Sequence, residues 1–344
     1  MNCLIIDYYE DHFHDQFNSI HIDSILKSGA NVTLCGKEEH FSQQYRKSCS
    51  FVCIPKWMFH ETSIRLLSSI YNRFWDALKL RFVSRIIRQG NYDLVVILRY
   101  EIYSIIFLRT RKKTLMFDHV SAAMMTSKAK QAVLKTLPDN YIHIALNDEI
   151  KKHIIRCLNK RDVIMIPHGY QNAFAPVDKS IFVNNSEKFI FCAATSSCDM
   201  DLLGKIVNSE EILAYFKKNG IKLIVKGNMP LINSTENVIV IDSYISKDDY
   251  SYLISKSYCV FLPYDDSFGF RVSGVFFECV ANNTPVIATY IPAFMPYFEE
   301  KQPMALVNSV GDFINALKVL NNKSRVWDKS KMNPDIYWKE IICN

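Results

Sequence analysis

The stretch at residues 259–293 places the strongest constraint on the fold, because it follows the pattern of a strand, a loop, a helix and a second strand. Residues 259–262 are a short apolar run that stops at Pro263, as a buried strand of a parallel sheet does. Asn282 and Asn283 end the apolar helical segment that follows, and residues 284–289 form the second apolar run. Two buried strands joined by a helix predict a parallel α/β sheet, with residues 263–273 at its carboxyl edge.

The loop between the first strand and the helix carries groups that suit an anion. Ser273 is a predicted helix cap, and Gly274 allows close approach to the backbone amides. Arg271 lies beside them as a fork-shaped partner for phosphate. Glu278, about one and a half turns into the helix, could accept two hydroxyl protons from a ribose. The residues therefore predict a diphosphate site with a carboxylate nearby, although one inward carboxylate on a helix is also compatible with plain architecture.

At these residues the chain resembles the nucleotide-sugar glycosyltransferases of the two-domain GT-B fold, specifically the large retaining family usually numbered four. The matching segments are Phe268-Gly269-Phe270, Glu278-Cys279 and residues 283–288, NTPVIA. Glu278 matches the second Glu of the family's paired-Glu motif, and Phe270 stands where the first would be. The tetrad at residues 271–274, Arg-x-Ser-Gly, resembles a subgroup found among bacterial surface-polysaccharide transferases.

The resemblance implies roles for particular residues. The predicted catalytic residues are His119, which would contact the donor sugar and support the reacting centre, and Arg271 and Lys226, which would neutralise the diphosphate. The predicted donor-binding residues follow in chain order: Tyr244, Gly269, Phe270, Ser273, Gly274 and Glu278. The alternatives are a hydrogen-bonded structural histidine for His119 and a surface lysine for Lys226. The position of a family arginine is occupied here by Thr195 or Ser196.

The chain has 344 residues, which suffices for two domains with a core each. We expect an α/β GT-B fold, with two Rossmann-like doubly wound domains facing each other across a cleft. The predicted boundaries are residues 1–172 for acceptor binding, 186–325 for nucleotide-sugar binding, and 326–344 for a helix that crosses back to the first domain. Pro176 and the polar run at residues 184–186 mark the linker between the domains.

Charge is unevenly distributed along the chain. Residues 1–170 contain 24 Lys and Arg against 16 Asp and Glu, whereas the remainder contains 17 against 19. Residues 64–89 combine basic side chains with an expected apolar side, listed as Leu66, Leu67, Ile70, Phe74, Leu78, Phe82 and Ile86. This pattern predicts an amphipathic core helix with a solvated face. A surface that also touches anionic lipid or a lipid-linked pyrophosphate is the alternative.

Metal and disulfide chemistry is not expected. The ten cysteines are scattered and lack short paired spacings, which favours free thiols in a reducing compartment. Asp199 and Asp201 form a D-x-D triplet that could hold a metal, but they precede a helix predicted at residues 202–219, where acidic residues are favoured anyway. No apolar run approaches the roughly 18 residues of a membrane span. We therefore expect a cytoplasmic protein, with peripheral contact to the inner face of the cell membrane as a hypothesis.

Three functions remain open from the sequence. The first is retaining, metal-independent transfer of a sugar from a UDP- or GDP-sugar to a glycan or lipid-linked glycan, without nucleic acid as a partner. The second is a catalytically silent binding or regulatory protein, which Phe270 and a first loop without glycine favour. In that loop His12 and His14 are candidates for acceptor contact or are solvated. The third is a sugar-nucleotide 2-epimerase of the same architecture.

Overall fold

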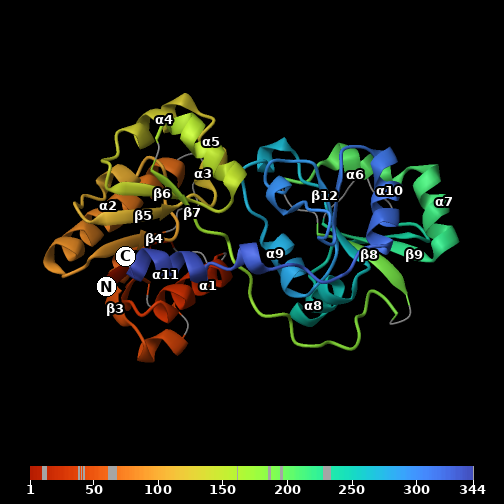
Figure 1. Cartoon of the computed structure of the whole chain (residues 1–344), viewed down its shortest axis with the longest axis horizontal. Coiled ribbons are helices and arrows are strands. Elements are labelled where there is room, and N and C mark those ends of the chain that lie inside the picture. Colours follow the sequence, from red (N-terminus) through yellow and green to blue (C-terminus); the bar gives the residue numbers. More distant parts are fainter. Residues whose placement is uncertain are drawn as a thin grey trace. The chain divides into compact units, whose positions relative to one another are not determined.

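The computed structural model describes residues 1–9, 14–37, 39, 41, 43–60, 68–160, 162–184, 187–193, 197–227 and 234–343. The chain divides into two compact units, Met1–Gly169 with Met332–Asn344, and Tyr170–Lys331. Each unit contains one parallel sheet covered by helices (Figure 1). His12, Thr195, Ser196 and residues 64–67 lie outside the described part, so predictions for them stay predictions.

The first unit is built on a seven-stranded sheet of order β3-β2-β1-β4-β5-β6-β7. All its strand pairs are parallel, with β1 between β2 and β4. The strands are β1 Asn2–Asp7, β2 Asn31–Gly36, β3 Ser50–Cys53, β4 Leu94–Ile97, β5 Lys113–Phe117, β6 Tyr141–Ala145 and β7 Val163–Met165. The helices are α1 Asp15–Lys27, α2 Ser68–Gln89, α3 Ser121–Met124, α4 Lys128–Lys135, α5 Asp148–Leu158 and α11 Asp335–Cys343.

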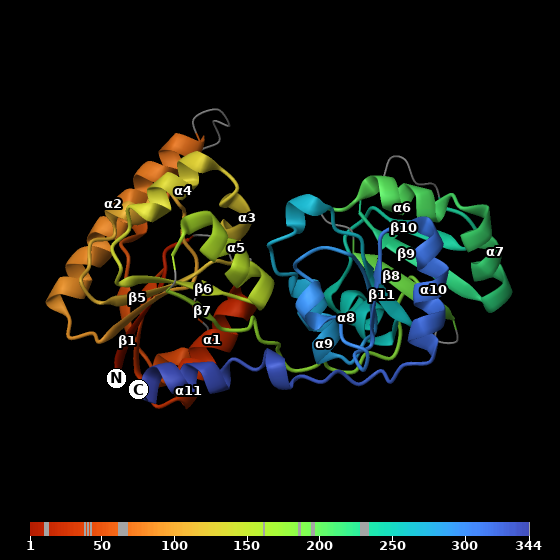
Figure 2. The same ribbon diagram turned by 45° about the horizontal axis from the view of Figure 1, so that its top comes forward.

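Helix α11 closes the first unit by packing beside α1 (Figure 2). The indole Nε1 of its fully buried Trp338 donates a 3.1 Å hydrogen bond to Nδ1 of His21 on α1. The hydroxyl of Ser24 donates to Asp335 at 2.6 Å. The end of the chain therefore belongs to the first sheet's packing, although more than 300 residues separate these partners in sequence.

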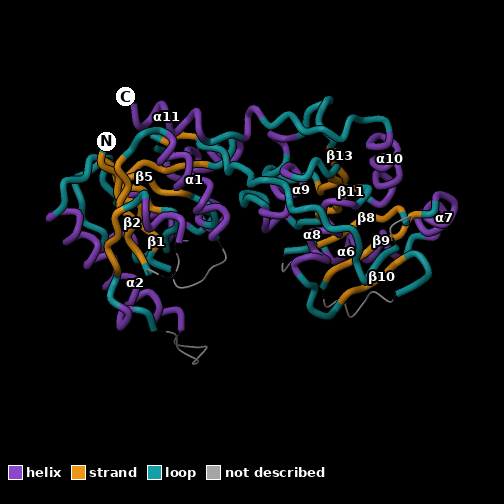
Figure 3. Tube along the Cα trace, turned by 90° about the horizontal axis from the view of Figure 1, so that it is seen from below, coloured by secondary structure: helices purple, strands orange, loops and turns teal. Residues whose placement is uncertain are grey.

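The second unit has a six-stranded parallel sheet of order β10-β9-β8-β11-β12-β13, drawn in orange in Figure 3. Its strands are β8 Lys188–Ala193, β9 Ile221–Lys226, β10 Val238–Ile241, β11 Cys259–Leu262, β12 Val286–Thr289 and β13 Met304–Val307. The helices are α6 Met200–Val207, α7 Glu210–Asn219, α8 Lys247–Lys256, α9 Gly274–Ala281 and α10 Val310–Asn321. Side chains of α6, α7 and α10 form one core with β8, β9 and β11, whereas α8 contacts α9.

Two sequence predictions about helices are wrong. The helix expected at residues 202–219 is two helices, because α6 ends at Val207 with Asn208 as its C-cap, and Ser209 caps α7 by accepting the amide of Ile212. On α2 the expected buried side is misplaced, since Ile70 is 69% exposed and Phe74 is 57% exposed. The buried stripe consists of Asp76, Lys79, Leu80, Val83, Ser84 and Ile87. Burial of Lys79 is possible because its amine binds Asp76 at 2.7 Å and the carbonyl of Tyr8 at 2.9 Å.

Candidate functional site

In the second unit, the loop after β11 meets the loop after β8. Cys198 and Tyr264 form an antiparallel bridge, the amide of Asp199 donates to the carbonyl of Pro263 at 2.6 Å, and the amide of Asp265 donates to Ser197 at 3.0 Å. Strands β8 and β11 are neighbours at the point where the strand order reverses. In open parallel sheets, ligands bind at this switch point, outside the carboxyl ends of the strands.

Helix α9 begins here as expected. Ser273 is its N-cap and accepts the amide of Phe276 at 3.2 Å. The hydroxyl of the buried Tyr264 lies 2.9 Å from the Ser273 hydroxyl, and the Tyr264 ring stacks on Phe268 at 4.0 Å. The first two amides of the helix, at Gly274 and Val275, have no intrahelical partner. Gly274 is exposed, and nothing lies within 4 Å of the position a Cβ would take. The helix start is therefore rigid and open to an anion.

Arg271 lies two residues before the cap, and no described residue supplies it with a counter-charge. Its side chain is half-buried, and its Nε is buried without a hydrogen-bond partner. Among the residues that the structure describes, no carboxylate pairs with its guanidinium. An arginine that is partly removed from water and unpaired is costly in an isolated chain, so an anionic ligand at this position would offset the cost.

Glu278 points from α9 toward α8. Its Oε2 accepts a 2.6 Å hydrogen bond from the hydroxyl of Tyr250, and its Oε1 makes no hydrogen bond to the described residues. Burial raises the pKa of Glu278 above its ordinary value, and the Tyr250 hydrogen bond lowers it in part. Tyr250 is a site residue that sequence reasoning missed, because the contact joins two helices 28 positions apart and leaves no local pattern.

The remaining predicted residues of this unit lie on or near the same sheet edge. Gly269 is buried and Phe270 half-buried in the loop that contains Arg271. Lys226, the last residue of β9, donates a 2.7 Å hydrogen bond to the carbonyl of Ser243. Tyr244 is 87% exposed after β10. Strand β8 lies between β9 and β11, so Lys226 and Arg271 belong to different sides of the switch point.

The D-x-D triplet has ordinary structural contacts. Asp199 caps α6 by accepting the amide of Leu202 at 2.9 Å, and Asp201 pairs with Lys205 at 2.5 Å. Across the described residues, no group of three His, Cys, Asp or Glu side chains could hold a metal ion. The cysteines of the described chain are free thiols.

In the first unit, His119 follows β5 and lies in a cluster of aromatic rings. Its centroid is 4.5 Å from the ring of His14, 4.9 Å from Phe17 and 5.8 Å from His168. Its Nδ1 is buried without a hydrogen-bond partner. Burial, and then the neighbouring His14 and His168, lower the pKa of His119 well below its usual value. His119 is therefore a neutral imidazole at physiological pH.

Asp118, directly before His119, belongs to a separate buried network. Its Oδ1 accepts hydrogen bonds from the hydroxyls of Tyr100 and Ser121, the latter at 2.9 Å. Its Oδ2 lies 2.9 Å from Nδ1 of His143 on β6. Asp118 and His143 are fully buried, so this network joins the segments that follow β4 and β5 to β6 in the interior of the unit.

Comparisons with known proteins support the fold. No protein-family model matches the sequence, and no curated protein matches it. Among solved structures, sucrose-phosphate synthase from Thermosynechococcus elongatus is 11% identical with a TM-score of 0.64, over 99% of this chain and 94% of that one. Anabaena HepE in complex with UDP and glucose is 12% identical with a TM-score of 0.60, over 99% and 94% of the two chains. UDP-GlcNAc 2-epimerase from Methanocaldococcus jannaschii is 12% identical with a TM-score of 0.60, over 100% and 99%.

These likenesses extend over both units. The predicted fold class is confirmed: the chain has two Rossmann-like α/β domains with parallel sheets, as GT-B glycosyltransferases do. Since the solved structures include both transferases and an epimerase, the fold leaves the reaction to be argued from the site.

Proposed function

We propose that this protein is a glycosyltransferase that moves a sugar from a nucleoside-diphosphate sugar to an acceptor hydroxyl. The observation that carries the proposal is the unpaired Arg271 beside the open amides of Gly274 and Val275. Together they would hold the donor's two phosphates at the start of α9. HepE, which shares the fold, was solved with UDP and glucose, and that ligand class has the chemistry this site requires.

Glu278 would bind the ribose of the donor. Its Oε1 makes no hydrogen bond to the described residues, and Tyr250 fixes the carboxylate through Oε2. A carboxylate is an acceptor only, which suits a pair of ribose hydroxyls. The exposed Tyr244 would lie against the base, and Gly269 and Phe270 would border the donor sugar. Phe270 cannot provide the hydrogen bonds of a carboxylate there, so recognition of the sugar would depend on other groups.

In the reaction, the bond from the anomeric carbon to the diphosphate breaks, and a bond to the acceptor oxygen forms. Negative charge develops on the leaving diphosphate, where Arg271 and the α9 amides would stabilise it. Lys226 could assist if its amine left the carbonyl of Ser243. His119 would contact the sugar as a neutral imidazole. Retention follows from the resemblance to family four, with the leaving phosphate accepting the acceptor's proton, so no protein nucleophile or metal is required.

For the acceptor we propose a glycan or lipid-linked glycan of a surface polysaccharide. Helix α2 favours contact with an anionic membrane surface, because it exposes the apolar Ile70 and Phe74 together with basic residues. These are Arg81, Arg85 and Arg88. The described residues contain no helix long and apolar enough to cross a bilayer. Changing the three arginines to Glu should abolish co-sedimentation with anionic vesicles, and unchanged co-sedimentation would refute membrane contact.

A nucleotide-release assay tests the proposed function. The protein is incubated with UDP- and GDP-sugars in EDTA, with and without glycan acceptors. Acceptor-dependent release of nucleoside diphosphate supports the transferase. Release without an acceptor, together with a 2-epimeric sugar, would show an epimerase instead. Nucleotide-sugar binding without turnover under every condition would show a binding protein.

A further inference from the structure

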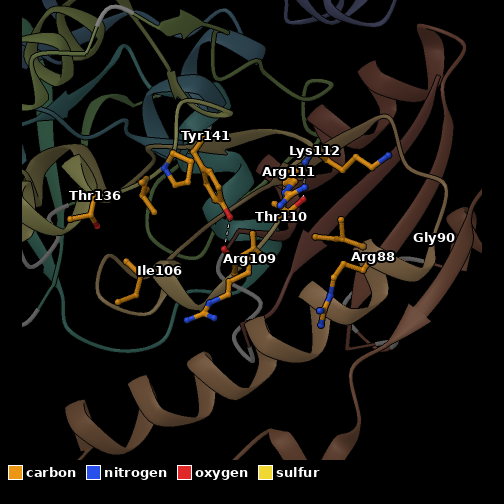
Figure 4. A pocket seen from close by; sticks show the side chains of 13 residues that line it. Arg88, Gly90, Ile106, Arg109, Thr110, Arg111, Lys112, Thr136 and Tyr141 are labelled. Atoms are coloured by element: carbon orange, nitrogen blue, oxygen red, sulfur yellow. Dashed lines mark hydrogen bonds between the residues drawn. The ribbon is translucent and has the colours of Figure 1, made fainter.

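The first unit contains a cavity of about 670 Å³, and of its lining residues only Arg88 has a role above, in the proposed membrane contact (Figure 4). It is lined by the end of α2 and by the segments that lead into β5 and β6, listed as Ile87, Arg88, Gly90, Ile106, Leu108, Arg109, Thr110, Arg111, Lys112, Thr136, Leu137, Pro138 and Tyr141. The lining segments precede the strands, whereas His119 follows the carboxyl end of β5. Five strand residues, at about 3.3 Å each, separate the two edges by roughly 15 Å. The cavity is therefore distinct from the candidate site.

The cavity lining is apolar at its base and strongly cationic at its edges. Leu108 and Leu137 are buried there, and Ile87, Ile106, Pro138 and the Tyr141 ring add further apolar surface. Arg88, Arg109, Arg111 and Lys112 supply the cations, and no carboxylate is among the lining residues. None of these cations forms an ion pair within the described part of the chain. Arg88 and Arg109 extend toward the same side in Figure 4.

The backbone that carries these cations is held in place. The amide of Arg109 donates to Ser84 at 2.8 Å, and the side-chain amide of Asn140 donates to the carbonyls of Thr110 and Lys112 at 3.2 and 2.7 Å. The hydroxyl of Tyr141 donates to the carbonyl of Leu108. Hydrogen bonds thus fix the backbone that carries these cations, while the cations themselves have no carboxylate partner among the described residues. This is the arrangement of a preformed anion site.

We propose that this cavity binds a phosphate-bearing amphiphile, with its phosphate at the edge lined by the exposed arginines and its apolar portion on the buried Leu108 and Leu137. Three guanidinium groups suit the several oxygens of a phosphate and its charge of up to about −2. A volume of this size fits a small molecule or the upper part of one lipid, within the usual range of roughly 300–1,000 Å³. The proposal does not depend on the proposed function, because it concerns the opposite edge of the sheet.

Titration calorimetry on the full chain tests this proposal with three soluble probes. Dihexanoyl phosphatidic acid carries both the phosphate and the apolar chains, glycerol 3-phosphate carries the phosphate alone, and dihexanoyl phosphatidylcholine carries the chains with no net charge. We expect saturable binding of the first, with affinity at least roughly tenfold greater than that of the other two. Equal binding of all three, or no binding of dihexanoyl phosphatidic acid, would overturn the proposal.

Matched variants localise the binding. Arg109→Gln with Arg111→Gln should weaken dihexanoyl phosphatidic acid binding by roughly tenfold or more. Lys113→Gln with Lys135→Gln removes the same charge from exposed residues next to the cavity that do not line it, and should leave binding unchanged. Equal losses in the two double variants would show a nonspecific charge effect and overturn the site. Thermal unfolding of each variant shows whether it is folded.

Two further measurements ask whether the ligand comes from a bilayer or from solution, and whether the cavity affects nucleotide release. Phosphatidylcholine vesicles that contain phosphatidic acid test whether a lipid in a bilayer reaches the cavity. If it does, the Arg109 and Arg111 double variant binds these vesicles more weakly than the Lys113 and Lys135 control variant. If a free metabolite is the ligand, the two variants bind the vesicles equally, and the Arg109 and Arg111 variant loses only the binding of the soluble probes. Nucleotide release from UDP- and GDP-sugars should be unchanged in the same variant. Failure of the release assay in the wild type would therefore count against the transferase and leave the cavity proposal standing.

Discussion

The two sheets carry polar clusters at their carboxyl edges, and the clusters differ in how completely the hydrogen bonds of their central charged group are satisfied. Around Asp118, both carboxylate oxygens are bound by Tyr100, Ser121 and His143 in a buried network, although the far nitrogen of His143, Nε2, has no hydrogen-bond partner among the described residues. Around α9, Arg271 has a buried Nε without a partner, and Glu278 uses one oxygen. A satisfied cluster stabilises the fold, whereas an unsatisfied one keeps its hydrogen-bonding capacity for a ligand.

The largest effect should follow from removing the centre of the satisfied cluster. Asp118→Ala leaves two hydroxyls and an imidazole without their acceptor in the core, and should lower the free energy of unfolding by about 3 kcal/mol. Denaturant unfolding measures the loss. Asp201→Ala is the matched control, because its solvent-exposed ion pair with Lys205 should contribute little to stability. Equal stability of the two variants would contradict a structural role for Asp118.

Removing Arg271 should reduce activity without reducing stability, which is the opposite of the effect expected for Asp118. Arg271→Ala should slow turnover by about a hundredfold, because the charge that develops on the leaving diphosphate loses its main partner. The melting temperature should stay the same or rise, since no described residue loses an ion pair. Steady-state kinetics and thermal unfolding check both parts, with exposed Lys256→Ala as the control for lost charge. A destabilised variant with normal kcat would show that Arg271 serves the fold instead.

Glu278 lies between these two cases, because one of its carboxylate oxygens binds Tyr250 and the other makes no hydrogen bond to the described residues. Glu278→Ala should weaken UDP-glucose or GDP-sugar affinity by roughly tenfold to a hundredfold through loss of the ribose hydrogen bonds. Tyr250→Phe keeps the carboxylate and should cost only severalfold, which identifies Tyr250 as a positioning residue. Calorimetric titration measures both. Wild-type affinity in Glu278→Ala would refute its contact with the nucleotide.

The smallest effect concerns pH. Because burial raises the pKa of Glu278, protonation begins at a higher pH than for an ordinary glutamate, and the acceptor is lost as pH falls through that range. Donor affinity should therefore decline severalfold as the pH falls from neutral toward the ordinary range of a glutamate, and Glu278→Gln should flatten the profile. An intact nucleotide sugar is the appropriate ligand, because the terminal phosphate of a free nucleoside diphosphate titrates near pH 6. An identical pH profile in Glu278→Gln would assign the titration to another group.

Local sequence patterns were sufficient for the fold class and for the start of α9. Buried parallel strands are continuous apolar runs in the sequence. Ser273 is a typical N-cap residue directly before an apolar helical segment. Both patterns are local, so they can be recognised without tertiary information. The same patterns placed the buried side of α2 wrongly, because the Asp76–Lys79 pair allows a charged stripe to face the sheet. The Tyr250–Glu278 bond and the Asp118 network join distant segments, so no local spacing indicates them. The cavity ringed by Arg88, Arg109 and Arg111 likewise assembles from three separate segments.

The central claim is that the donor's diphosphate binds at the start of α9, and a crystal structure of the protein with a bound UDP- or GDP-sugar tests it most directly. We predict phosphate oxygens within hydrogen-bonding distance, about 3 Å, of the Arg271 guanidinium and of the Gly274 or Val275 amide, with the ribose hydroxyls on Glu278. Electron density for the nucleotide at any other place, with Arg271 and Glu278 contacting solvent alone, would contradict the account.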